Sequence, residues 1–89
     1  MKTIYKFELK ITESQQVETN RGMKPLSVQC IDDKVFLWGM VDTEANKTSY
    51  NVRIYGTGHK LSLADREDSG SYVGTVQQFN GKLVWHVFV

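Results

Sequence analysis

The chain is poor in cysteine, proline and histidine, and these shortages exclude several classes of protein. Its 89 residues include one cysteine, one proline and two histidines. Cys30 alone can form neither a disulfide within the chain nor a cysteine-rich metal site. We interpret Cys30 as a small apolar residue of a strand. No other residues have the spacing of metal ligands, so we expect no bound metal and no cofactor.

An excess of one charge and long apolar runs are also missing. Eleven basic and ten acidic residues leave a formal net charge of +1. That balance gives no electrostatic signature of nucleic-acid or membrane binding. No apolar run approaches the roughly 20 residues that span a bilayer. The first residues return to charge at Lys2 and Lys6, unlike a signal peptide. We therefore expect a cytoplasmic protein that neither binds nucleic acid directly nor enters a membrane.

What the sequence has is a hydrophobic pattern with a period of two residues, which predicts strands. In residues 5–11, apolar side chains alternate with charged ones, as in a half-buried strand. Comparable runs cover 16–19, 26–30, 35–41, 48–55, 72–79 and 82–89. With turn signals between them, these runs predict an all-β fold, a small antiparallel sandwich or barrel of about six to seven strands. We expect one domain over residues 1–89, with one short helical turn in the 60–67 loop.

Two hairpin turns are indicated by their residue types. Asp32-Asp33-Lys34 separates two apolar runs and predicts a tight turn. Asn80-Gly81 is the strongest short hairpin signal in the chain, because a type I′ turn needs positive φ at both central positions.

Two of the expected strands are apolar on both faces, which is a large number of such strands for a domain of this size. They cover 35–41 and 82–89. Such a strand lies either between two layers or under a second subunit. We therefore expect a homodimer or higher homo-oligomer with Trp85, His86 and Phe88 in its interface.

The loop after the run 48–55 combines glycines, a hydroxyl and a titratable side chain, in the order Gly56-Thr57-Gly58-His59. Glycines let backbone N–H groups approach an anionic ligand, and Thr57 and His59 add polar side chains. The alternative is structural: the glycines supply positive φ at a strand end, and His59 caps the loop. The pattern lacks the third glycine of a dinucleotide fingerprint and the lysine of a phosphate loop.

Three further residues extend this candidate ligand site. Tyr55 and Tyr72 bracket the long loop, and Tyr55 falls opposite the apolar face of its strand. Either ring could stack on a base, and Arg53 could help neutralise a bound charge. No serine or threonine sits in a nucleophile elbow, and the adjacent carboxylates fall in turns and loops. We therefore expect a binding protein and not an enzyme.

The sequence resembles a family of small phage and prophage proteins, mostly uncharacterised, nearly from end to end. The resemblance rests on 4–9, 26–29, 37–38 followed by 41–45, 55–59, 72–77 and 83–88, which include the Tyr-Gly-Thr-Gly-His loop and the Leu-Val-Trp-His-Val-Phe strand. Trp85 stands where phenylalanine is commoner in that family. The resemblance implies that the loop and His86 recur in relatives, and that the protein is a phage accessory protein acting in the host bacterial cytoplasm.

Three functions follow as expectations. The first is a host counter-defence protein that captures a small nucleotide-like anionic ligand at the Gly-Thr-Gly-His loop. The alternative is a protein–protein inhibitor or adaptor that acts on a host defence protein through an exposed strand near 84–89, by edge pairing or strand exchange. The second alternative is a minor structural component of the phage particle.

Overall fold

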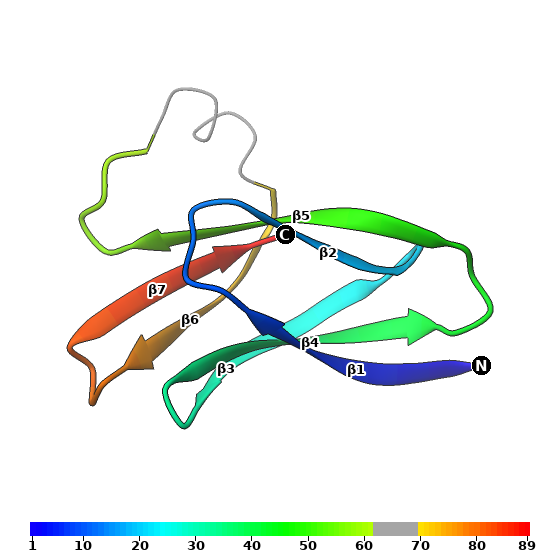
Figure 1. Cartoon of the computed structure of the whole chain (residues 1–89), viewed down its shortest axis with the longest axis horizontal. Coiled ribbons are helices and arrows are strands. Elements are labelled where there is room, and N and C mark those ends of the chain that lie inside the picture. Colours follow the sequence, from blue (N-terminus) through cyan, green and yellow to red (C-terminus); the bar gives the residue numbers. More distant parts are fainter. Residues whose placement is uncertain (62–69) are drawn as a thin grey trace.

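The computed structural model describes residues 1–61 and 70–89, which form seven strands and contain no helix. The strands are β1 (Lys2–Leu9), β2 (Gln15–Asn20), β3 (Lys24–Ile31), β4 (Lys34–Asp42), β5 (Lys47–Gly56), β6 (Tyr72–Gln78) and β7 (Leu83–Phe88) (Figure 1). The predicted all-β fold is therefore confirmed. The helical turn expected in the 60–67 loop falls mainly on residues outside the described ranges.

The strands form two antiparallel sheets. One has the order β1-β4-β3 and the other the order β2-β5-β7-β6. The two sheets meet where β3 lies beside β6, two strands that are far apart in the sequence (Figure 1). Every strand neighbour within the sheets is antiparallel. The two-residue period and the short turns therefore account for the strands and for the β3–β4 and β6–β7 hairpins, whereas the other pairings join segments far apart in the sequence.

The core lies between the sheets and is built from alternate residues of their strands. On β4, Val35, Leu37 and Val41 are almost completely buried. Their neighbours Phe36 and Trp38 lie on the opposite face and are half-buried. The core cluster comprises Leu9, Met23, Val35, Leu37, Val41, Val52, Ile54, Val76 and Val87. Complete burial of such a side chain contributes about 1.5–3 kcal/mol, so this small cluster carries much of the stability.

The hairpin turn between β3 and β4 is the predicted tight turn. Asp32 and Asp33 have φ of 51° and 61°, the positive values that a type I′ turn requires. Aspartate tolerates this left-handed region better than most residues. The prediction for Asp32-Asp33-Lys34 is confirmed.

The turn between β6 and β7 is longer than the sequence predicted. Phe79, Asn80 and Gly81 have φ of 53°, 57° and 83°, so Phe79 belongs to the turn and not to β6. The Phe79 N–H donates to the Asp33 Oδ1 at 3.0 Å. This hydrogen bond joins the two hairpin turns, which compensates for the uncommon backbone of Phe79.

A buried amide reinforces this junction of the sheets. The Gln78 side chain is 6% exposed. Its Nε2 donates to the Asp33 carbonyl at 2.6 Å, and its Oε1 accepts from the Trp85 Nε1 at 2.7 Å. The indole N–H of Trp85 is therefore satisfied within the chain.

The strand 84–89 has no free edge over its paired residues. β7 lies between β5 and β6, and backbone pairing occupies both of its sides. The expectation that this strand pairs with a partner through its edge is therefore wrong. Its apolar composition reflects a central position, which places Val87 in the core and Phe88 on the other face.

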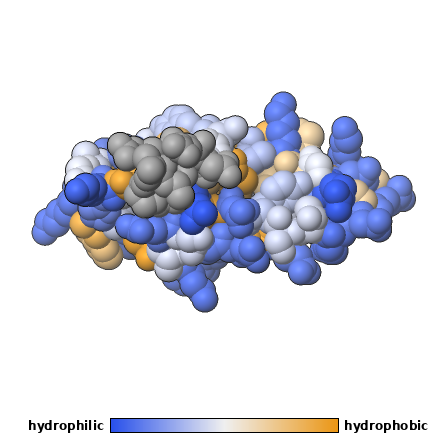
Figure 2. All heavy atoms as spheres, turned by 90° about the horizontal axis from the view of Figure 1, so that it is seen from above, coloured by the Kyte–Doolittle hydropathy of each residue, from blue (hydrophilic) through white to orange (hydrophobic). Residues whose placement is uncertain are grey.

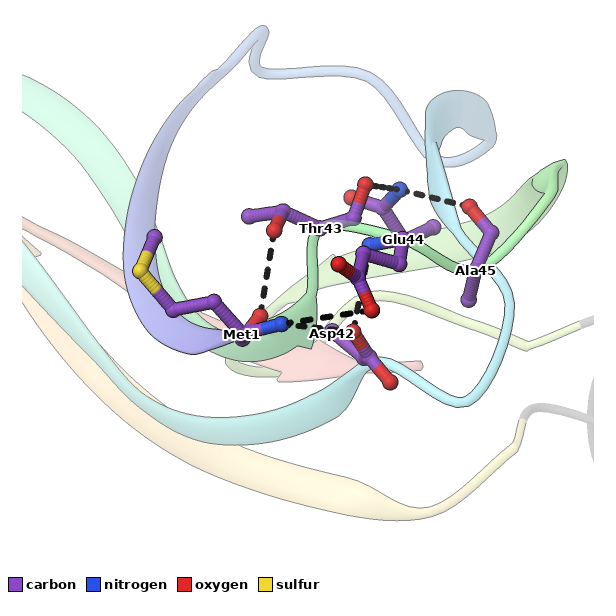
Figure 3. A network of polar contacts seen from close by, with 6 residues as sticks. Met1, Asp42, Thr43, Glu44 and Ala45 are labelled. Atoms are coloured by element: carbon purple, nitrogen blue, oxygen red, sulfur yellow. Dashed lines mark hydrogen bonds and ion pairs between the residues drawn. The ribbon is translucent and has the colours of Figure 1, made fainter.

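Polar contacts join Met1 to the end of β4. The Met1 ammonium lies 3.4 Å from the Asp42 Oδ1, and the Thr43 hydroxyl donates to the Met1 carbonyl at 3.1 Å (Figure 3). The Thr43 N–H also donates to this carbonyl, at 2.8 Å. The pKa of Asp42 is lowered, chiefly by a hydrogen bond from the Glu44 N–H and next by the Met1 ammonium. This end of the three-stranded sheet is therefore held by polar contacts.

The surface seen from above in Figure 2 is mainly hydrophilic, with small separate apolar patches. In the described ranges, no helix is long and apolar enough to cross a membrane.

Candidate functional site

The Gly-Thr-Gly-His loop begins where β5 ends and closes on itself. The His59 N–H donates to the Gly56 carbonyl at 3.0 Å, and the Gly56 N–H donates to the His59 Nδ1 at 3.2 Å. Because Nδ1 accepts this bond, the proton of the neutral ring lies on Nε2. The Gly56 N–H, which we expected to face a ligand, is therefore used within the loop, as the structural alternative predicted.

The local structure explains why both Gly56 and Gly58 are glycines. A Cβ on Gly56 would lie 2.6 Å from the His59 Cε1, so the imidazole covers this position only because it has no side chain. Gly58 has φ of +83°, which favours glycine, and a Cβ there would meet nothing within 4 Å. The loop thus needs Gly56 for packing and Gly58 for its backbone.

Thr57 takes part in a chain of polar side chains that runs from the loop after β5 across β7 to β6. Its Oγ1 lies 2.7 Å from the His86 Nε2, and the His86 Nδ1 lies 3.0 Å from the Thr75 Oγ1. The Tyr72 hydroxyl then lies 2.6 Å from the Thr75 Oγ1. Thr57, Tyr72 and His86 were predicted site residues, but no sequence pattern joined the three, and Thr75 was not predicted.

The two tyrosines differ in their access to a ligand. Tyr55 is 5% exposed and Tyr72 is 59% exposed. Both rings make edge-type contacts with Phe88, at centroid distances of 5.7 and 5.5 Å. Tyr55 therefore does not offer the open stacking face that we expected, because its ring is covered. Tyr72 is exposed, so its stacking on a base stays a prediction. Arg53 lies on β5 opposite Phe88 and is half-buried.

A small cavity adjoins the loop. It measures about 160 Å³ and is lined by Gly56, Thr57, His59, Lys82, Leu83, Val84 and Trp85. Among these lining residues Lys82 has a positively charged side chain, which residues 56–59 lack, and Lys82 was not among the predicted site residues. Lys82 follows the Asn80-Gly81 turn, so folding that hairpin against the end of β5 brings it to the loop.

His59 and Trp85 line both this cavity and a second one. Their ring centroids are 5.9 Å apart with an interplanar angle of 70°. The second cavity also measures about 160 Å³ and is lined by Ile11, Thr12, Glu13, Ile54, His59 and Trp85. Each is smaller than the roughly 300–1,000 Å³ of usual ligand pockets. A cavity of this size suits a phosphate group, so a larger ligand would extend over the surface.

The chemistry of the first cavity favours an anion. Thr57, His59 and Lys82, three of its lining residues, have side chains that can donate hydrogen bonds, and Lys82 adds a positive charge. Within residues 1–61 and 70–89, no three histidine, cysteine, aspartate or glutamate residues cluster as metal ligands would.

Fold and site together define a small two-sheet β domain with a shallow polar cavity beside one loop. The family model described as "Domain of unknown function (DUF7352)" matches residues 1–89, and the chain belongs to this family. No curated protein and no solved structure matches the chain.

Proposed function

We propose that this protein is a non-catalytic binding protein that captures a small nucleotide-like anion. The observation that carries the proposal is the cavity lined by Thr57, His59 and Lys82, where hydrogen-bond donors and a positive charge meet. A phosphate group fits that cavity in size and charge. The base of the ligand then lies outside the cavity, over the exposed part of the sheet.

The polar chain on this sheet supplies a route from the cavity to an exposed ring. Thr57 bonds His86, His86 bonds Thr75, and Thr75 bonds Tyr72. Hydroxyl and imidazole groups along this route can hydrogen-bond a sugar or a base edge. Tyr72, which is 59% exposed, is the ring on which a base would stack.

The biological role that we propose is host counter-defence. The resemblance to small phage and prophage proteins supports a phage accessory protein that acts in the bacterial cytoplasm. Binding without turnover would lower the concentration of a nucleotide signal that the host uses in defence. The alternative, inhibition of a host protein, would have to use a surface other than the edge of β7, since that edge is paired.

The test is thermal unfolding in the presence of linear nucleotides, cyclic nucleotides and inorganic phosphate. A ligand at a hundred times its Kd adds about 2.7 kcal/mol to the free energy of unfolding, which raises Tm by several degrees in a domain of this size. Thr57→Val and Lys82→Gln should abolish or reduce the shift. Both are better tests than a bulky residue at Gly58, whose positive φ would strain any replacement.

Lys47→Gln is the matched control, because it removes one lysine at the start of β5, far along the strand from the loop. It should leave the nucleotide-induced shift unchanged. A panel without any shift, or a shift that persists in both site variants, would refute nucleotide capture at this cavity.

A further inference from the structure

The three-stranded sheet carries a row of apolar side chains on the face opposite the core. Phe36, Trp38 and Met40 alternate along β4 with core residues, and all three are half-buried. Ile4, which is 54% exposed, lies opposite Met40 on β1. The core and the four-stranded sheet lie on the other side of β4, where Leu37 and Val41 are buried. We call Phe36, Trp38, Met40 and Ile4 the β4 outer row.

Lysines surround the β4 outer row. The Lys6 Nζ lies 4.8 Å from the centroid of the Phe36 ring and 5.8 Å from that of Trp38. The strand register places Lys24 opposite Met40, and Lys34 precedes Phe36 on the same face of β4. The charged groups of this face are Lys2, Lys6, Lys24 and Lys34 against Glu8 and Asp42. The Asp42 carboxylate already contacts the Met1 ammonium.

This excess of positive charge favours an anionic occupant over a second copy of the chain. Packing the face against itself would bring the lysines of two copies together, which destabilises a dimer. The excess is invisible in the whole-chain charge of +1, because acidic residues elsewhere offset it. A local basic and aromatic face thus coexists with a nearly neutral chain.

The geometry of the row fits bases linked by phosphates. Residues two apart on a strand lie on the same face, about 7 Å from each other. Successive bases of an extended single strand can stack on successive aromatic rings at such a spacing, as they do on other small β domains. The Lys6 ammonium lies over both rings, and when the exposed lysine side chain moves aside for the bases it can pair with a phosphate between them. Ser27 and Gln29, opposite Trp38 and Phe36 on β3, offer hydrogen bonds to base edges.

We propose that the β4 outer row, with its lysines, is a binding site for single-stranded nucleic acid. Phe36 and Trp38 stack on bases, and Lys6 pairs with the phosphate between them. The site is independent of the nucleotide cavity, which β5, β7 and the loop after β5 form on the other sheet. It revises our expectation from composition that the protein does not bind nucleic acid directly.

The experiment is fluorescence anisotropy with labelled oligothymidylate and oligouridylate of about 10 nucleotides, within the usual site size of small β domains. Both oligonucleotides should bind at low salt, and their ratio distinguishes DNA from RNA as the preferred strand. Trp38→Leu should weaken binding by about 5- to 150-fold, the range for loss of one stacked base. Lys6→Gln should reduce the slope of log K against log salt by about 0.7, the value for one lost phosphate contact on a single strand.

Lys47→Gln is again the matched control, since it removes one lysine from the other sheet and should preserve both affinity and slope. Circular dichroism checks the fold of Trp38→Leu, and the Lys6→Gln slope decides the question if that variant unfolds, because Lys6 is exposed. The proposal is overturned by absence of binding at low salt, or by equal affinity of wild type and both variants. Equal affinity for a duplex, or a dimer that Trp38→Leu dissociates, would also overturn it.

Discussion

The Asp42 carboxylate accepts a hydrogen bond from the Glu44 N–H at 3.1 Å and lies 3.4 Å from the Met1 ammonium (Figure 3). These contacts lower its pKa below the ordinary value of 3.8. A carboxyl with a lowered folded pKa stabilises the fold above its unfolded pKa, and loses that contribution as pH falls through the folded pKa. We therefore predict that wild type exceeds Asp42→Asn in Tm at neutral pH, and that the difference shrinks in acid. Thermal unfolding from about pH 7 to about pH 2 measures this difference.

The control for this experiment is Glu18→Gln on β2, an exposed carboxyl with no comparable contacts to the residues that the structure describes, 1–61 and 70–89. Its difference from wild type should vary less with pH. A pH-independent difference for Asp42→Asn would show that the side chain acts by geometry alone, contrary to the prediction.

At the residue scale, sequence patterns predicted which residues lie on which strand face or in the loop, but they did not predict which other residues surround them. Alternation placed Tyr55 on the correct face of its strand, but it could not show that the ring is covered and packs against Phe88. The loop motif selected Thr57 and His59, whereas Lys82 comes from a distant part of the chain. Its role depends on tertiary structure, which no local pattern contains.

At the scale of the elements, Gln78 joins the two sheets through one buried side chain. It bonds the Asp33 carbonyl and the Trp85 indole, so its removal leaves a carbonyl and an N–H without their partner. An unsatisfied buried polar group costs about 1–3 kcal/mol. We predict that Gln78→Ala lowers the free energy of unfolding by about 2–4 kcal/mol once lost packing is included. Urea unfolding measures the change.

Gln77 provides the matched control, because it is the same residue type one position earlier on β6 and is exposed. Gln77→Ala should change the free energy of unfolding by less than about 0.5 kcal/mol. Similar losses in the two variants would mean that the bonds of Gln78 do not hold the sheets together.

Strand pairing within hairpins could be predicted, but strand order could not. Asn80-Gly81 centres a hairpin in which Thr75 faces His86, and the structure has this pair. The register then shifts between Tyr72 and Gly74, where an irregularity interrupts the ladder. That β7 is central depends on pairing with β5, a contact between distant segments that the local pattern leaves open.

At the scale of the whole molecule, the two sheets present two different outer faces. The four-stranded sheet carries the polar chain from Thr57 to Tyr72, next to the small cavity. The three-stranded sheet carries Phe36 and Trp38 with Lys6 between them. We propose that the domain uses one outer face for a small anion and the other for a polymer, because each outer face is built from residues that the core does not need.

The predicted homodimer also concerns the whole molecule. We expect its interface to form on the outer face of β7. Phe88 is half-buried there and contacts the exposed Tyr72, whereas the Trp85 indole N–H donates a hydrogen bond to the Gln78 side chain. We therefore predict that the dimer interface centres on His86 and Phe88 with Tyr72, and that Tyr72→Ser shifts the protein toward monomer. Light scattering after size-exclusion chromatography over a range of protein concentrations measures the change.

Phe79→Ser is the control for this experiment, because Phe79 is 48% exposed but lies in the β6–β7 turn. It should leave the association unchanged. A wild-type protein that stays monomeric at every concentration would contradict the dimer. The predicted interface covers the Tyr72 ring, on which a base would stack. A bound nucleotide must therefore change the dimer dissociation constant. Dimerisation must change the affinity for the nucleotide by the same factor. Measuring both constants therefore tests whether the dimer and the ligand share Tyr72.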